Sequence, residues 1–450
     1  MAQRKMRDEG QAETAIRSFS RAYERLASGA ATMIASAELE PVSDVPGLDE
    51  LSPEPGALAH VAVIKLNGGL ATTMGLRSPK SLVEAREGRS FLDVIVGQTL
   101  ALRRRLEVEL PLLLMDSEAT QADTLEALSR EPALVQDLPA DFLQGMVPKI
   151  DAADLTPARW PKQPSLEWCP PGHGDVYGAL ARSGILAALL ERGFRYAMIS
   201  NADNLGATAD ERIAAYVARE QVPFLMEVVE GTAADRKGGH IARRLADGTL
   251  VLRETAQTPT DDEESFRDFR RWRYYNTNNL WVDLRVLEAT MAANEGVLEL
   301  PLIVNPKTVD PRDPSSPKVL QLESAMGAAI SSFAGARILR VPRTRFIPVK
   351  TTDDLLVLRS DVYSLTAEMF VQPLAARADD LPLAELDPAY YKLLDEFEAR
   401  FPAGPPSLVG AERLTVRGNV TFGRDVVVRG AVEIDAPQPR VIEDGAVLAG

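Results

Sequence analysis

The chain has 450 residues, too many for one ordinary hydrophobic core, so we expect a large domain with one or two smaller parts. Its 50 lysines and arginines stand against 65 aspartates and glutamates, and the formal charge of −15 argues against nucleic acid or anionic membrane as a partner. A single cysteine, Cys169, excludes an internal disulfide, and with three scattered histidines it provides no zinc-binding set, so any metal should be a hard cation held by oxygen.

Residues 1–55 are predicted to form a helical segment followed by a linker. Apolar side chains recur at helical spacing at Ile16, Phe19 and Leu26, and a stretch rich in proline and acidic residues, "EPVSDVPGLDELSPEPGALAH", follows them. The N-terminus has no apolar signal core, and no run approaches the roughly 20 apolar residues that span a bilayer. We therefore expect a cytoplasmic protein with no membrane partner.

Residues 56–365 are predicted to form an α/β domain with a mixed or parallel sheet. Short β-rich runs, among them "VAVIKL", "PLLLMD", "YAMIS" and "PFLMEVV", alternate there with helical patterns. A helical connector is expected over 366–405. Residues 406–450 have a different pattern, in which short Val-rich segments are separated by Gly- and Asn-containing turns, as in "LTVRGNVTFGRDVVVRGAVEI". This pattern predicts a small solenoid of β coils.

The first candidate site is a glycine loop after a predicted strand, "VIKLNGGLATTMGLRSPKS". Gly68 and Gly69 would let backbone N–H groups approach a phosphate or a base, although a tight strand-to-helix turn is an alternative explanation. The loop has neither the P-loop spelling nor the dinucleotide fingerprint. Lys80 follows Pro79, whose fixed φ would aim the ammonium at a phosphate; the alternative is a solvated lysine.

Two further stretches follow predicted strands or precede predicted helices. In "WCPPGHGDVYGAL", Gly172 and His173 stand near a helix N-terminus, where free N–H groups favour anions, but a lone histidine can also be structural. In "YAMISNADNLGATAD", Asp203 follows a buried strand. Ligands of open α/β sheets bind beyond the carboxyl ends of the strands, so Asp203 is the best candidate metal ligand.

Several stretches together resemble one family. "KLNGGLATTMGLRSPKS", "PPGHGDVY", "SNADNLGATAD", "YYNTNNLWVDL" and "RFIPVKTTDDLLVLRSDVY" are similar, in order and spacing, to the eukaryotic-type UTP–glucose-1-phosphate uridylyltransferases, from about residue 15 to the end. The resemblance implies a Rossmann-like nucleotidyltransferase domain, an N-terminal helical segment and a C-terminal left-handed β-helix. Some members assemble through this last part, so a homo-oligomer formed through it stays open for this chain, as do monomer and dimer.

The resemblance also implies residue roles. The loop that holds uracil and ribose corresponds to Leu66, Asn67, Gly68 and Gly69. Gln144 would read the uracil edge with an amide that both donates and accepts, and Gly172 would lie beneath the base. Asn201 would lie near the ribose, and Asp203 would bind Mg²⁺. Glucose 1-phosphate would contact His173, Asn276 and Asn278, and the phosphates would contact Lys80 and Lys350.

The implied reaction is an in-line attack by a phosphate oxygen of glucose 1-phosphate on the α-phosphorus of UTP, which expels pyrophosphate. Mg²⁺ and the two lysines would neutralise the charge of the two anionic reactants. A wider basic pocket is expected to include Arg77, Lys149, Arg343 and Arg345 as well, although a structural role is an equal alternative for the arginines. The alternatives are a broad-specificity UDP-sugar or UDP-N-acetylhexosamine pyrophosphorylase, and a non-catalytic nucleotide-binding protein, which we would expect to have lost Lys80, Asp203 or Lys350.

Two residues of the first loop depart from the family pattern. Ala71 stands where the family usually has a glycine, and its methyl group could crowd the loop or forbid a positive φ. Ser78 replaces the usual glycine before Pro79 and Lys80. Both substitutions put the shape of the loop in question.

Overall fold

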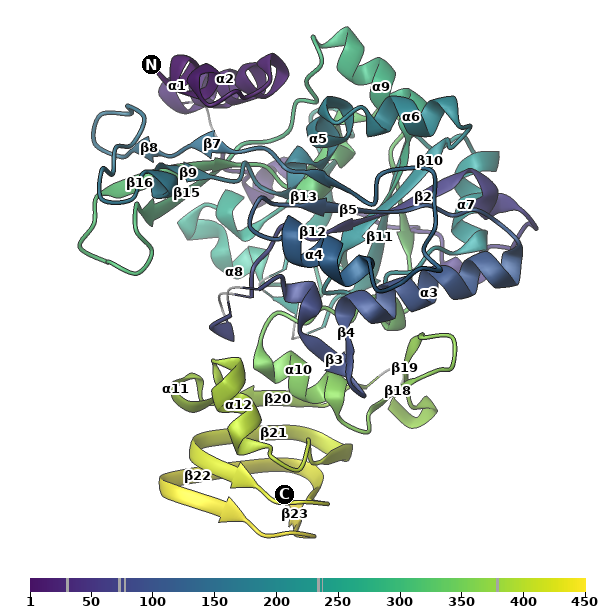
Figure 1. The fold of residues 1–450 in the computed structure, drawn as a ribbon, viewed down its shortest axis with the longest axis vertical. Coiled ribbons are helices and arrows are strands. Elements are labelled where there is room, and N and C mark those ends of the chain that lie inside the picture. Colours follow the sequence, from purple (N-terminus) through teal and green to yellow (C-terminus); the bar gives the residue numbers. More distant parts are fainter. Residues whose placement is uncertain (30–31, 72–73, 77, 233–234, 237, 378–379) are drawn as a thin grey trace.

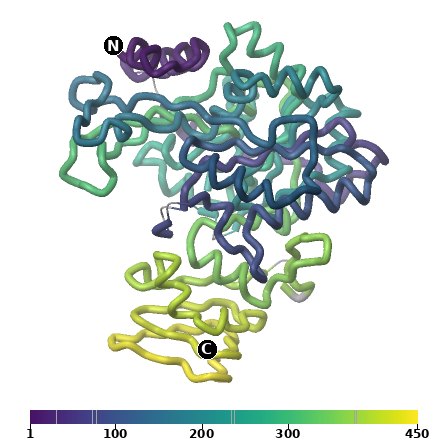
Figure 2. Tube along the Cα trace, viewed as in Figure 1, coloured from purple at the N-terminus to yellow at the C-terminus, as the bar shows by residue number. Residues whose placement is uncertain are grey.

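The structure is a computed structural model of the chain that describes residues 1–29, 32–71, 74–76, 78–232, 235–236, 238–377 and 380–450. The N-terminal helices lie against an α/β body, and a stack of strands follows at the opposite end (Figure 1). The tube in Figure 2 runs from the purple N-terminal helices through the body to the yellow C-terminal strands. Within the described residues, no helix has both the length and the apolar character needed to cross a membrane.

The α/β body is built on a central sheet to which ten strands contribute among the described residues. Its main path runs β1-β12-β14-β10-β2-β5-β6, and β11, β13 and β17 pair at its side. Four neighbouring strands pair in parallel, namely β10 (Tyr196–Asn201), β2 (Val61–Leu66), β5 (Leu112–Asp116) and β6 (Asp141–Leu143), and β11 and β17 form a further parallel pair. The others are β1 (Leu39–Pro41), β11 (Phe224–Glu230), β12 (His240–Arg244), β13 (Leu250–Arg253), β14 (Tyr274–Asp283) and β17 (Arg337–Arg340). This confirms the predicted mixed α/β fold.

Both faces of the sheet are covered, because the side chains of each strand alternate between two hydrophobic cores. Val63 of β2 packs into one core and Ile64 into the other, as the period of two requires. One core includes side chains of α3 (Phe91–Leu106) and α7 (Glu211–Arg219), and the other includes side chains of α5 (Val176–Arg182), α6 (Ile185–Glu191) and α9 (Leu284–Ala293). Continuous apolar runs such as "VAVIKL" are therefore central strands.

The N-terminal segment is helical, as predicted: α1 spans Ala2–Asp8 and α2 spans Glu13–Ala27. Ile16 and Phe19 are buried in a separate core with Val147 and Leu322. That core includes residues of a small sheet formed by β8 (Ile150–Asp151), β15 (Ile303–Thr308) and β16 (Lys318–Glu323). The expected linker is not wholly irregular, because its residues 40 and 41 belong to the edge strand β1 of the central sheet.

The C-terminal part is a stack of parallel strands. The four strands are β20 (Leu383–Leu386), β21 (Ser407–Phe422), β22 (Val427–Ile442) and β23 (Val447–Ala449). Inward-facing Val416, Phe422 and Val428 are buried in the stack. Between the body and this stack lie α10 (Thr352–Arg359), β18 (Tyr363–Leu365), β19 (Val371–Pro373), α11 (Pro388–Tyr391) and α12 (Leu394–Arg400). The expected helical connector thus contains strands as well as helices.

Candidate functional site

The carboxyl ends of the central parallel strands open into a cavity of about 300 Å³. Its lining includes ten of the residues that the sequence singles out: Leu66, Asn67, Gly68, Gly69, Lys80, Gln144, Gly172, His173, Asn201 and Asp203. They come from segments that lie far apart in the chain and meet because parallel strands end at one edge of the sheet. We call this cavity the nucleotide pocket below, after the ligand that the sequence resemblance predicts for it.

The first glycine loop is anchored from beneath by Asn67. Its side-chain amide donates to Oδ1 of Asp116 at 2.7 Å and to Oγ1 of Thr124 at 2.9 Å. Asp116 is fully buried, and the loss of hydration raises its pKa to about 6. Asn67 therefore uses its amide to hold the loop on the end of β5.

The glycines of this loop leave room for Gln144. A Cβ atom at Gly68 would lie 2.7 Å from Oε1 of Gln144, whereas a Cβ at Gly69 would meet no atom within 4 Å. The backbone N–H of Gln144 donates to the Asp116 carbonyl at 2.8 Å. The carboxamide of Gln144 thus lies over the bare backbone of Gly68 at the wall of the pocket.

Ala71 and Ser78 fit the loop without strain. The N–H of Ala71 donates to the Ser78 carbonyl at 3.2 Å, and Leu70 and Pro79 form an isolated antiparallel bridge beside this bond. Ala71 is buried, and neither it nor Ser78 has a positive φ. The departures from the family pattern therefore do not force the loop into the left-handed region.

Lys80 and Asp203 form an ion pair across the pocket. The Lys80 Nζ lies 2.8 Å from Oδ2 of Asp203, and each side chain is 20% exposed. The backbone N–H of Lys80 donates to the Gly69 carbonyl at 3.2 Å, so the position of the lysine does not depend on its ammonium group. The carbonyl of Asp203 accepts a hydrogen bond from the Val349 N–H at 3.1 Å, which brings the segment before Lys350 to the pocket.

A hard cation fits at Asp203 only with help from a ligand. The part of the chain that the structure describes contains no group of three or more His, Cys, Asp or Glu side chains able to hold a metal ion. Asp203 supplies one partly exposed carboxylate, and Mg²⁺ typically takes one or two carboxylates and fills its other positions with phosphate oxygens and water. The donor set therefore suits Mg²⁺ that arrives with a nucleotide.

His173 lies at the pocket as a neutral hydrogen-bond donor. Its Nδ1 accepts the backbone N–H of Met326 at 3.0 Å, so the proton of the neutral ring is on Nε2. Loss of hydration lowers its pKa to about 4, and the ring is uncharged at neutral pH. Gly172 has φ +81°, and a Cβ there would lie 2.4 Å from the Ser324 carbonyl oxygen, so this position requires glycine.

Asn276 and Asn278 lie on β14, beside the nucleotide pocket rather than in its wall. Nδ2 of Asn276 donates to Oδ1 of Asn278 at 2.8 Å, and Asn278 has φ +57°. A Cβ at Gly327 would lie 3.0 Å from Nδ2 of Asn276, and Gly327 directly follows Met326, the residue that binds His173. These contacts place the two asparagines and His173 around one neighbouring region.

Glu254 belongs to the same region and was not predicted. Asn276 donates its backbone N–H to the Gly239 carbonyl, and a Cβ at Gly239 would lie 2.7 Å from the Glu254 carboxylate. Burial raises the pKa of Glu254, and the nearby ammonium of exposed Lys350 opposes that shift. The same signal that identified Asp203, a carboxylate after a buried strand, was available for Glu254, because Glu254 directly follows the buried strand β13.

The prediction that further basic residues line the pocket is wrong for Lys149, Arg343 and Arg345. Lys149 is buried and donates to the Val309 carbonyl at 2.9 Å, and Arg345 lies 2.6 Å from the buried carboxylate of Glu227. Arg343 forms an ion pair with Asp235. These cations are bound within the protein because they satisfy buried acceptors and carboxylates. The remaining member, Arg77, lies outside the described residues.

A buried lysine beneath the pocket gives a prediction about stability. Lys65 donates to Oγ of Ser200 at 2.9 Å and to the Ala207 carbonyl at 2.6 Å, and burial lowers its pKa from 10.5 to about 7. Between these values the unfolded chain binds a proton that the folded protein lacks, so raising the pH stabilises the fold by up to about 1.4 kcal/mol per pH unit. Lys65→Met should flatten this rise in urea denaturation between pH 7 and 9; equal slopes in parent and variant would contradict it.

Comparison with known proteins agrees with the geometry. A family model described as UTP–glucose-1-phosphate uridylyltransferase matches residues 16–429. The UTP–glucose-1-phosphate uridylyltransferase of Hordeum vulgare is 39% identical over 436 residues, which cover 94% of this chain and 90% of that protein. The enzyme of the same name from Saccharomyces cerevisiae is 39% identical over 400 residues, covering 87% and 80%.

Solved structures show the same fold over the whole chain. A mutant UDP-glucose pyrophosphorylase from Leishmania major in complex with UDP-glucose has a TM-score of 0.94 and 44% identity, and covers 99% of this chain and 96% of that chain. Open and closed structures of the Leishmania major enzyme give a TM-score of 0.95 at 43% identity, with coverage of 100% and 97%. The chain therefore belongs to the UTP–glucose-1-phosphate uridylyltransferase family.

Proposed function

We propose that the protein transfers the uridylyl group of UTP to glucose 1-phosphate and forms UDP-glucose and pyrophosphate. The observation that carries this proposal is the nucleotide pocket, in whose wall the glycine loop, Gln144, Lys80 and Asp203 meet. A phosphate oxygen of glucose 1-phosphate forms a bond to the α-phosphorus of UTP while the bond from that phosphorus to the β-phosphate oxygen breaks. Both electrons of the broken bond leave with pyrophosphate, so no covalent enzyme intermediate is needed.

In this proposal the residues of the chain act by positioning and by charge. The base lies against Gly68 and Gly69, and Gln144 offers its amide donor and acceptor to the pyrimidine edge. Lys80 leaves Asp203 and turns to the phosphates of UTP, and exposed Lys350 meets the phosphate of the sugar. In the neighbouring region, Nε2 of His173 donates a hydrogen bond to glucose 1-phosphate. Asn276, Asn278 and Glu254 contact the same substrate there. Mg²⁺ held by Asp203 supplies additional neutralisation of phosphate charge when it is bound.

Further features of the family are proposed with this function. We infer four parts, residues 1–55, 56–365, 366–405 and 406–450, with Asn201 beside the ribose, a cytoplasmic location and UTP and glucose 1-phosphate as small-molecule partners. The parallel stacking of β21, β22 and β23 supports a left-handed β-helix in the last part, and β20 of the preceding part extends this stack. The exposed Val441 and Val447 on its strands support contact with a second copy.

The Gly68 position gives a prediction about nucleotide binding. Because a Cβ there would lie 2.7–2.8 Å from the carboxamide of Gln144, Gly68→Ala should push this flexible side-chain end out of place without unfolding the loop. We expect the KM for UTP to rise roughly tenfold, or about 1.4 kcal/mol, while the KM for glucose 1-phosphate changes little. Steady-state kinetics with each substrate varied measure both constants, and an unchanged KM for UTP would contradict the placement of Gln144.

The proposed function is tested by pyrophosphate release from UTP with a panel of sugar 1-phosphates. We expect kcat/KM to be highest with glucose 1-phosphate and far lower with galactose 1-phosphate and N-acetylglucosamine 1-phosphate. Comparable values across the panel would support a broad-specificity pyrophosphorylase instead. No release with any sugar phosphate in the presence of Mg²⁺ would overturn the proposed function.

A further inference from the structure

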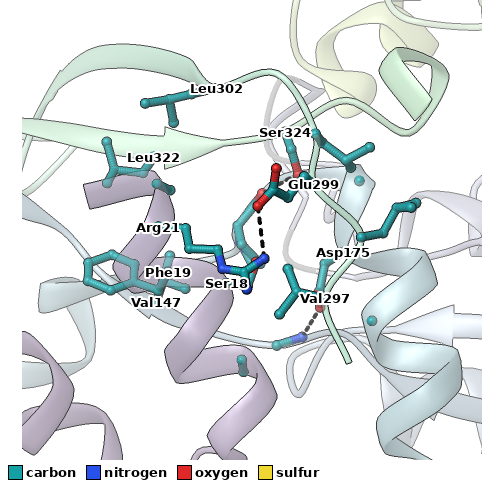
Figure 3. A pocket seen from close by; sticks show the side chains of 18 of the residues that line it. Ser18, Phe19, Arg21, Val147, Asp175, Val297, Glu299, Leu302, Leu322 and Ser324 are labelled. Carbon is teal, nitrogen blue, oxygen red and sulfur yellow. Dashed lines mark hydrogen bonds and ion pairs between the residues drawn. The ribbon is translucent and has the colours of Figure 1, made fainter. Parts of the chain in front are cut away.

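A second cavity of about 450 Å³ lies between α2 and the α/β body, next to segments that also line the nucleotide pocket. Figure 3 shows Phe19 and Arg21 of α2 on one side and Asp175 on another, with Arg21 paired to Glu299. Gly145 and Asp175 line this cavity, whereas Gln144 and His173, close to them in sequence, line the nucleotide pocket. The same two short segments therefore contribute residues to both cavities.

Asp175 binds the backbone of this wall directly. Its Oδ2 accepts the N–H of Gly145 at 2.6 Å. The Nη2 of Arg182 donates to both carboxylate oxygens of Asp175, at 2.8 and 2.7 Å, and the side chains of Arg182 and Asp175 are 17% and 11% exposed. Hydrogen bonds between charged partners are shorter and stronger than neutral ones, so this pair gives the Gly145 N–H a firmly held acceptor.

The sequence of α5 makes room for this pair. Asp175 precedes the helix and Arg182 ends it, so the arginine must reach back over two turns. A Cβ at Gly178 would lie only 2.5 Å from Nη1 of Arg182, which shows that the guanidinium crosses the helix at this glycine. A Cβ at Gly145 would likewise lie 3.1 Å from both Arg182 Nη2 and Asp175 Oδ2. Two glycines thus allow the close approach of the pair to the backbone.

The bond from Gly145 completes the fixation of Gln144. The N–H of Gln144 itself donates to the Asp116 carbonyl at 2.8 Å, and the next N–H donates to Asp175. With both amides held, the Cα–Cβ direction of Gln144 is set, and its carboxamide lies over Gly68. A change of the peptide after Gln144 would move the carboxamide along that surface.

We propose that Asp175 and Arg182 are positioning residues that hold the Gln144–Gly145 peptide, so that the Gln144 carboxamide selects uracil over cytosine. The inference rests on the proposed function. Neither residue needs to touch the nucleotide, because both act through the backbone of Gly145. Uracil and cytosine differ at the edge that an amide can read, since one offers N–H and carbonyl where the other offers a ring acceptor and an amino group.

The test is the ratio of the Kd for CTP to the Kd for UTP, measured by titration calorimetry on the full chain with Mg²⁺. A smaller fraction of folded protein raises the apparent Kd for CTP and for UTP by the same factor, so a merely structural role would not change this ratio. We expect Asp175→Asn and Arg182→Met to lower the ratio at least tenfold, and Arg182→Lys, which keeps a cation beside Asp175, to recover part of it. Arg21→Gln is the matched control, because it breaks an ion pair on the opposite side of the same cavity and should leave the ratio unchanged.

A ratio within twofold of the parent in both Asp175→Asn and Arg182→Met would overturn the proposal. An unchanged ratio in Gln144→Ala would also overturn it, because there would then be no base-reading amide to position. If the parent prefers UTP and the variants lose this preference, the positioning role stands even when no UDP-glucose forms, and only the proposed function fails. The two failures are therefore distinguishable.

Discussion

Replacing Lys80 with alanine should lower kcat by roughly 10²–10³-fold while leaving the melting temperature almost unchanged. The ammonium is expected to face the phosphates of UTP, and a preorganised charge there acts on the transferring group. Stability should change little because the Asp203 side chain is partly exposed, so water can solvate its carboxylate once the ammonium is removed. The loop itself is held by the Lys80 N–H and the bridge at Pro79, which the substitution leaves in place.

Steady-state kinetics with both substrates varied, beside a melting curve, measure these effects. Lys318→Ala, at an exposed position of β16, is the matched control and should retain parental kcat. Lys80→Arg should restore only part of the activity, since a planar guanidinium needs more room than an ammonium. Lys350→Ala should also raise the KM for glucose 1-phosphate. Activity of Lys80→Ala within about threefold of the parent would show that the lysine is only a solvated loop residue.

Asp203→Asn should nearly abolish turnover with Mg²⁺, because a neutral amide is a much poorer ligand for a hard cation. The described residues contain no group of three or more His, Cys, Asp or Glu side chains that could take over the ion. The variant should still fold, since the side chain is partly exposed and the backbone carbonyl keeps its bond to Val349. Initial rates over a range of Mg²⁺ concentrations measure the effect.

Asp261→Asn, an exposed carboxylate in the run "DDEE", is the control and should titrate with Mg²⁺ like the parent. Near-parental rates of Asp203→Asn at low Mg²⁺ would mean that the metal ion is held elsewhere. A rate that recovers only at high Mg²⁺ would agree with weakened binding at Asp203.

The nucleotide pocket could be predicted because its residues obey a local rule. Gly68 and Asp203 each lie two residues after the end of a buried apolar strand, and the carboxyl ends of parallel strands share one edge. The sequence therefore indicated that these residues meet, although it did not show that Lys80 and Asp203 form an ion pair before any ligand binds. Nor did it show that Asn67 turns its amide down to Asp116.

The roles of the arginines could not be predicted, because a charge alone does not identify its partner. Arg345 pairs with Glu227, 118 residues earlier in the chain, and both are buried. Glu254 was missed because the sequence does not show which strand ends lie beside Asn276 and His173. The short strand β20, "LAEL", lies in the expected helical connector, where four residues are too few for the helical and strand periods to be distinguished.

Attack on the α-phosphorus at this pocket is tested most directly by an isotope experiment. Glucose 1-phosphate carrying ¹⁸O in its phosphate group is incubated with UTP, Mg²⁺ and the full chain, and the products are analysed by mass spectrometry and ³¹P NMR. All of the label should appear in UDP-glucose and none in pyrophosphate, with one pyrophosphate formed for each UDP-glucose. Label in pyrophosphate, or consumption of UTP without labelled UDP-glucose, would contradict uridylyl transfer by this protein.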